Sequence, residues 1–136
     1  MPTQRSMFMI DLIAAPPYVA AFRFSGKLTG EDYDRCIAEI EARLAEYPRI
    51  AILSDMTGMT GLSAEAVGKD LRYALDKFGE YSRFARAAVV TDKGWLGKVS
   101  EFSGKFLPKT EVRAFDPGQA DAALAWAAEL DPDAGD

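Results

Sequence analysis

The chain has 136 residues, of which 49% are hydrophobic and 27% charged, and its net charge at pH 7 is -5. This length and composition predict one domain over residues 1–136 with a sizeable core. The acidic balance argues against a general nucleic-acid binder, which needs a basic surface to displace phosphate counterions. The absence of histidine removes Ser-His-Asp and Cys-His catalysis and the usual zinc sites. We therefore expect no metal, no cofactor and no enzymatic activity.

Cys36 is the only cysteine, so an internal disulfide is impossible. It lies in an amphipathic helical pattern, which favours a small core residue over a nucleophile. The apolar N-terminal run is short, contains Asp11 and is broken by Pro16 and Pro17. Because such a run is neither a signal peptide nor a membrane span, we expect a cytoplasmic protein.

Two strands open the chain, over residues 7–12 and 18–24. The short proline-containing link between them favours an antiparallel hairpin, and Ser25-Gly26 is predicted to close the second strand.

A helix is predicted to begin at Thr29, because Thr29 and Asp32 make a start similar to a capping box. Pro48 ends this helix by disfavouring helical geometry at the residue before it. Apolar residues that recur at helical spacing give it one buried stripe: Tyr33, Ile37, Ile40 and Leu44.

The centre of the chain is a buried strand over residues 50–53, which is predicted to end at Asp55. A loop with Gly58 and Gly61 follows, and Ser63 is the N-cap of the next helix. A strand that stops at a carboxylate and leads to a helix N-terminus is where α/β sheets usually place their sites.

A strand over residues 84–91, a helical stretch over 92–106 and a strand over 109–115 come next. A final helix then starts at Asp116-Pro117, with the aspartate as cap and the proline in the first helical position. Its inner face carries Ala123, Trp126, Ala127 and Leu130.

The predicted order is β-β-α-β-α-β-α-β-α. Strands that alternate with helices pair in parallel through right-handed crossovers, whereas the first strand lies antiparallel at an edge. The fold class is therefore α/β, with a mixed five-stranded sheet that is mostly parallel.

Short motifs along the whole chain resemble one known family. They are Ser25-Gly26-Lys27-Leu28-Thr29 with Glu31-Asp32-Tyr33, then Leu53-Ser54-Asp55, Gly61-Leu62-Ser63, Ala87, Val89-Val90-Thr91-Asp92 with Trp95, Glu111-Val112-Arg113-Ala114-Phe115 and Ala125-Trp126. In this order they resemble the SpoIIAA-like proteins, relatives of the STAS domains. The resemblance implies a small α/β fold shared with anti-sigma-factor antagonists and similar to lipid-carrying CRAL-TRIO domains. For this branch it implies ligand binding or membrane association.

The resemblance has one departure. STAS antagonists are switched by phosphorylation of a serine in an Asp-Ser-Ser-Gly context, and Ser63 matches that serine by position. Its neighbours here are Leu62, Ala64 and Glu65, so the pattern that the kinase recognises is missing.

A polar cluster at the end of the central strand is the first candidate site; it consists of Asp55, Thr57, Thr60 and Ser63. One interpretation is the floor of a ligand pocket, with backbone N–H groups at the helix start able to hold an anion. The other is local capping and turn chemistry, in which the side chains of Asp55 and Ser63 satisfy nearby N–H groups.

The helical stretch over residues 92–106 is the second candidate site, because lysines surround an apolar stripe in an otherwise acidic chain. The stripe consists of Trp95, Val99, Phe102 and Phe106, and the lysines around it are Lys93, Lys98, Lys105 and Lys109. This helix either acts as a lid over a ligand pocket or lies on an anionic membrane surface. The alternative is a core-facing helix with solvated lysines.

Three functions follow from these sites. The preferred one is a non-enzymatic regulatory module that binds a small apolar or amphipathic ligand or associates weakly with an anionic membrane. Membrane association would place the protein at the inner face of the membrane. The alternative is a STAS-type protein-interaction switch controlled at Ser63, and an enzyme is the least favoured. An exposed edge strand also suits a homodimer.

Overall fold

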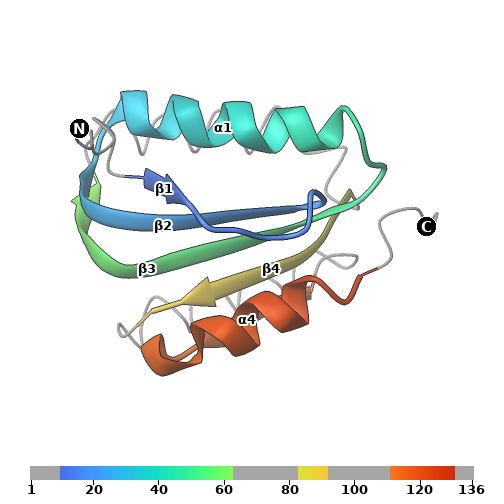
Figure 1. The fold of residues 1–136 in the computed structure, drawn as a ribbon. Helices are drawn as coiled ribbons and strands as arrows, with labels where there is room; N and C mark the ends of the chain where they lie inside the picture. Colours follow the sequence, from blue (N-terminus) through green and yellow to red (C-terminus); the bar gives the residue numbers. More distant parts are fainter. Residues whose placement is uncertain (1–9, 63–82, 92–110, 131–136) are drawn as a thin grey trace.

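The computed structural model describes residues 10–62, 83–91 and 111–130 of the chain. The elements in these ranges are β1 (Ile10–Leu12), β2 (Val19–Leu28), α1 (Gly30–Leu44), β3 (Ile50–Leu62), β4 (Phe84–Val90), β5 (Glu111–Phe115), a 3₁₀ turn (Pro117–Gln119) and α4 (Ala120–Ala127). Figure 1 shows their arrangement. The helices expected after Ser63 and over residues 92–106 lie outside the described residues.

The strands form one sheet in the order β1-β2-β3-β4-β5. β1 is antiparallel to β2, and the other three pairs are parallel. This confirms the predicted α/β class, the N-terminal hairpin and the antiparallel edge strand. The register places Asp55 of β3 between Arg23 of β2 and Val90 of β4.

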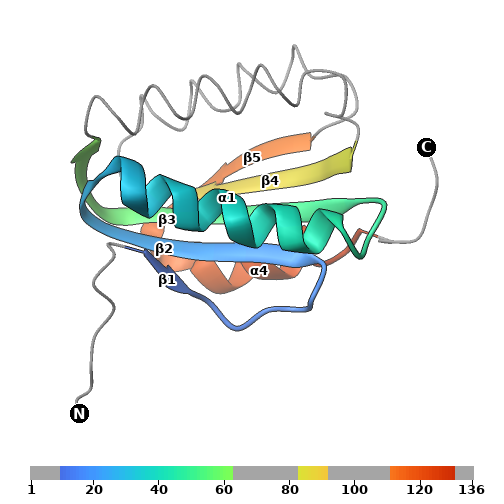
Figure 2. The same ribbon diagram turned by 90° about the horizontal axis from the view of Figure 1, so that it is seen from above.

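The sheet is covered on both faces, by α1 on one side and α4 on the other (Figures 1 and 2). The core on the α1 side is bulky: Ile10, Ala20, Phe22, Phe24, Leu28, Cys36, Ile40, Leu44, Ile50 and Phe84. The core on the α4 side is built largely from small residues: Val19, Ala21, Ala51, Leu53, Ala85, Ala88, Val90, Ala123, Ala127 and Leu130. The prediction that Cys36 is a core residue is confirmed.

The two ends of α1 are fixed by different means. At its start the Thr29 and Asp32 pair forms the predicted capping box: the Thr29 N–H donates to the Asp32 carboxylate at 2.8 Å, and the Asp32 N–H donates to Oγ1 of Thr29 at 3.3 Å. At its end and just beyond it, Arg83 donates to three backbone carbonyls, those of Leu44, Tyr47 and Pro48, at 2.6, 3.1 and 3.1 Å. A distant arginine therefore satisfies carbonyls that the helix itself leaves without partners.

Two predicted boundaries are wrong. β2 does not close at Ser25-Gly26 but continues to Leu28, and β3 does not become a loop at Asp55 but continues to Leu62. The two extensions pair with each other, and two register shifts bring the glycines into the ladder. Gly26 has a φ of 65°, and a Cβ at Gly58 would lie 3.2 Å from the carbonyl oxygen of Phe24. The glycines thus allow an irregular, closely paired strand where local turn chemistry suggested a loop.

Replacing Thr29 tests the capping box. Thr29→Ala should lower the free energy of unfolding by about 1–2 kcal/mol, because the Asp32 N–H and carboxylate lose the hydroxyl group. Urea denaturation measures the change. Thr29→Ser keeps the hydroxyl and should stay within about 0.5 kcal/mol of the wild type. Equal losses in the two variants would show that the hydroxyl does not carry the cap.

Candidate functional site

The carboxyl edge of the sheet is uneven, because β2 and β3 extend beyond the other parallel strands. β3 pairs with β4 only as far as Asp55, opposite Val90. Its remainder, Met56–Leu62, pairs with β2 alone among the described residues. In Figure 1 the ends of these two strands curve away from the sheet. The last part of β3 therefore projects from the edge where open α/β sheets usually bind ligands.

Asp55 lies on β3 at the start of this projecting part, and only 11% of its side chain is exposed. Its Oδ1 accepts a hydrogen bond of 3.1 Å from the Thr57 N–H. Its Oδ2 lies 3.6 Å from Nε of Arg23 on the neighbouring strand, and the Arg23 side chain is 56% exposed. Both carboxylate oxygens thus already have partners within the protein, one of them a local N–H of the kind that turn chemistry predicts.

The other predicted site residues are placed only in part. Thr57 is exposed and follows Asp55 on β3, and Thr60 belongs to the same strand. Ser63 comes directly after the end of β3 and lies outside the described residues. So do all the residues of the predicted lid or membrane-facing helix: Trp95, Lys98, Val99, Phe102, Lys105 and Phe106. The pocket and lid interpretations stay predictions.

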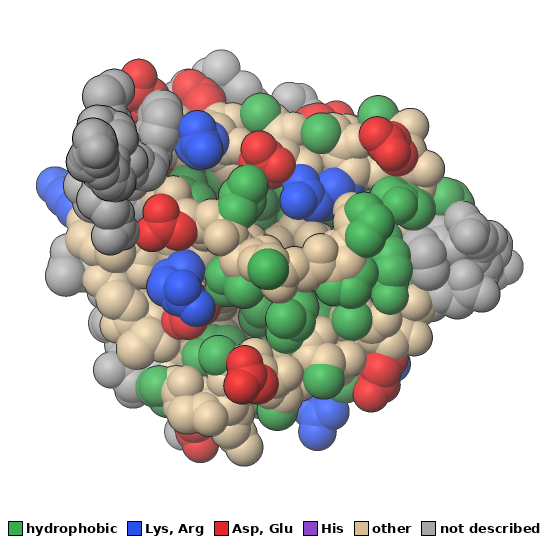
Figure 3. Space-filling view, viewed as in Figure 1, with side chains coloured by type: hydrophobic (Ala, Val, Ile, Leu, Met, Phe, Trp, Pro, Cys, Tyr) green, Lys and Arg blue, Asp and Glu red, His purple; other side chains and the backbone are tan. Residues whose placement is uncertain are grey.

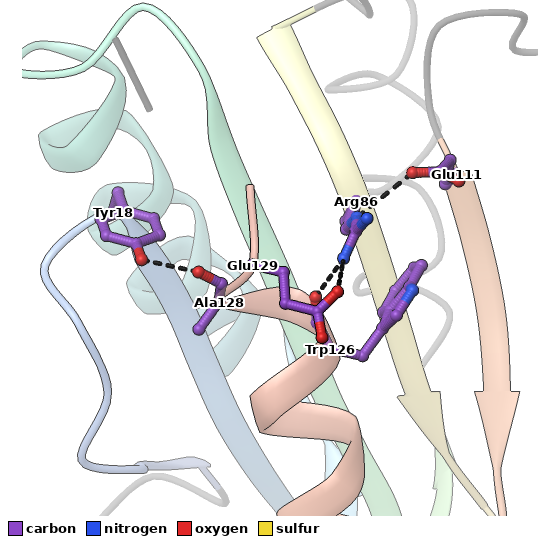
Figure 4. A network of polar contacts seen from close by, with 6 residues as sticks. All are labelled: Tyr18, Arg86, Glu111, Trp126, Ala128 and Glu129. Atoms are coloured by element: carbon purple, nitrogen blue, oxygen red, sulfur yellow. Dashed lines mark hydrogen bonds and ion pairs between the residues drawn. The ribbon is translucent and has the colours of Figure 1, made fainter. Parts of the chain in front are cut away.

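A polar network that the sequence did not reveal lies where α4 ends against the sheet (Figure 4). Arg86 of β4 is its centre: Nε lies 3.2 Å from the Glu111 carboxylate, and Nη1 lies 3.1 Å from the carboxylate of Glu129. Nη1 also donates to the carbonyl oxygen of Trp126, and the guanidinium carbon lies 4.7 Å from the centre of the Trp126 ring. One side chain thereby joins β4, β5 and the last turn of α4.

Tyr18 completes this network from the other end of the chain. Its hydroxyl group donates to the carbonyl oxygen of Ala128 at 2.7 Å, and its ring meets that of Tyr47 edge-on, with 6.1 Å between centroids. The carbonyls at the end of α4 are thus bound by side chains from β4 and from the residue before β2. An arginine inside the apolar run of residues 84–90 was the only signal in the sequence that such a partner exists.

Two classes of site find no support in the described ranges. No group of three or more histidine, cysteine, aspartate or glutamate side chains there could hold a metal ion. No helix within the same ranges is long and apolar enough to cross a membrane.

Comparison with known proteins identifies the family. The profile of the SpoIIAA-like family matches residues 19–128. A solved structure is similar to this one with a TM-score of 0.68 and 28% sequence identity, over 93% of this chain and 98% of the other. It is an uncharacterised protein of the DUF3478 family with a SpoIIAA-like fold, from Shewanella loihica PV-4. A search of curated proteins gives no match. A SpoIIAA-like fold suggests a regulatory module, and this chain belongs to the SpoIIAA-like family.

Proposed function

We propose that the protein is a non-enzymatic regulatory module that binds a small apolar or amphipathic ligand at the carboxyl edge of its sheet. The observation that carries this proposal is the projecting part of β3. Met56–Leu62 pairs with β2 and with no other strand in the described part of the chain. Its backbone donors and acceptors lie at the position where α/β sheets place ligands.

The side chains at the start of this segment suit an amphipathic molecule. Met56 packs against the core on the α1 side, whereas Thr57 and Gly58 are exposed. Ligand sites commonly combine apolar lining with a few polar groups that fix orientation. Because Arg23 lies beside Asp55, the carboxylate charge is compensated and opposes an apolar or anionic ligand less.

The basic aromatic stretch over residues 92–106 supports a link to membranes. Lys93, Lys98 and Lys105 within this stretch and Lys109 just after it would each contribute about 1 kcal/mol near an anionic surface. The net charge of -5 opposes this attraction, so the proposed association is weak and peripheral. Figure 3 shows a different apolar region, over β1 and the segment that follows it. Leu12, the last residue of β1, is 45% exposed and provides a matched control.

A second candidate function is a protein-interaction switch at Ser63. The observation that favours it is that β3 ends at Leu62, the residue that directly precedes Ser63 in the sequence. A phosphate group would add about -2 charge there. A partner that reads the projecting part of β3 would then bind differently before and after modification.

Native mass spectrometry of the protein purified from its own cells tests the ligand proposal. We expect a retained lipid-sized mass that organic extraction removes. Thr57→Val removes an exposed hydroxyl at nearly constant volume and should reduce the retained fraction severalfold, whereas Asp121→Asn on the exposed side of α4 should not. A bare chain mass in every preparation would contradict the proposal.

Liposome co-sedimentation tests the membrane proposal. Trp95→Ala should reduce binding to vesicles that contain phosphatidylserine by several fold, and added salt should weaken the binding of the wild type. Leu12→Ala serves as the control for general hydrophobicity and should leave binding unchanged. Equal binding by the wild type and Trp95→Ala would exclude the stretch over residues 92–106 as the contact with the membrane.

Intact-mass measurement tests the switch. We expect a fraction of the cellular protein to carry an added mass of about 80 Da that is absent from Ser63→Ala. In pull-downs, Ser63→Glu should then change partner recovery relative to Ser63→Ala. An unmodified mass together with identical pull-downs would rule out control at this serine.

A further inference from the structure

Arg49 has a buried nitrogen without a hydrogen-bond partner. The residue directly precedes β3, at the amino edge of the sheet, so it lies at the opposite end of the strand from the ligand site proposed above. Its side chain is half-buried, and its Nε is buried with no partner. A buried donor without an acceptor is uncommon in a folded protein and calls for an explanation.

Three other arginines near this edge donate from Nε to an acceptor of the chain, which Arg49 does not do. Arg43 donates to the Val19 carbonyl at 3.2 Å and pairs with Glu39 at 2.9 Å. Arg83 binds three carbonyls at and just beyond the end of α1. Arg86 binds the end of α4 and two glutamates. The chain therefore supplies acceptors for guanidinium groups at this edge, but not for Nε of Arg49.

The charge near Arg49 favours an anion. Nε of Arg83 lies 3.1 Å from the carbonyl oxygen of Pro48. This carbonyl belongs to the peptide bond that joins Pro48 to Arg49. The positively charged guanidinium group of Arg83 therefore lies beside the backbone of Arg49. An arginine stays protonated at any physiological pH, and its planar group matches the two oxygens of a carboxylate or phosphate.

We propose that Arg49 is the anchor of an anion-binding site at the amino edge of the sheet. The ligand is a phosphate or carboxylate group of a small molecule, and its oxygen supplies the acceptor that Nε lacks. Nε itself is buried, so the half-buried side chain turns outward when Nε and an adjacent Nη bind the anion. This site is separate from the carboxyl-edge ligand site and does not depend on it.

The test is an NMR titration of the full ¹⁵N-labelled chain, following the arginine Nε–H signals. Inorganic phosphate and acetate are added separately, at an ionic strength held constant with sodium chloride. We expect the Arg49 Nε–H signal, assigned through bonds from its own backbone, to shift saturably. Saturation by both anions would establish a general oxyanion site, and saturation by phosphate alone would establish a phosphate site.

Variants give a second readout by isothermal calorimetry. Arg49→Lys keeps the charge but lacks Nε, and it should bind phosphate at least tenfold more weakly than the wild type. Arg113→Lys is the matched control, because Arg113 is exposed and stacks on Phe115 and Trp126; it should bind as the wild type does. A linear, non-saturating shift of the Arg49 signal would overturn the proposal even if Arg49→Lys failed to fold. Equal affinities of the wild type and a folded Arg49→Lys would overturn it as well.

Discussion

The contact between α4 and the small side chains of the sheet is the constraint on which the other features depend. Ala123 and Ala127 are fully buried against a face lined by Ala21, Ala51, Ala85 and Ala88. Small residues on both sides let a helix approach a sheet closely, whereas the α1 face is filled by bulky residues such as Phe22 and Phe84. The close approach brings the end of α4 within reach of Arg86 and Tyr18. The alanines of the strands therefore determine where the polar network forms.

The order of the described strands along the chain and their parallel or antiparallel direction could be predicted from the sequence, but their lengths could not. Prolines at positions 16 and 17 and the Thr29 cap are local signals, and local signals were enough to place the hairpin and the first helix. Ser25-Gly26 and Gly58 are also local turn signals, yet there the prediction is wrong. The backbone pairing between β2 and β3 joins residues more than thirty positions apart and outweighs the local preference. A prediction made from short segments of the sequence does not include this long-range pairing.

At the candidate site, too, local features could be predicted from the sequence and long-range contacts could not. The sequence places Asp55 at the carboxyl edge, because a buried strand leads directly to it. It does not identify Arg23 as the charge beside Asp55, because that proximity depends on the register of two strands. Arg86 and Arg49 were missed for a related reason: the acceptors around an arginine are set by which elements become neighbours in space. Ser63 and the residues of the predicted lid lie outside the described ranges, so their roles rest on the proposals above.

The bond between Tyr18 and Ala128 also has a consequence for biosynthesis. It joins residues 110 positions apart, and α4 is needed to cover one face of the sheet. Contacts of such long range form slowly, because the intervening chain must be ordered first. While the ribosome is still making the last helix, the alanine-lined face of β2, β3 and β4 stays open to water. A nascent chain that stalls before residue 120 would expose this face, so it is a natural substrate for chaperones or for aggregation.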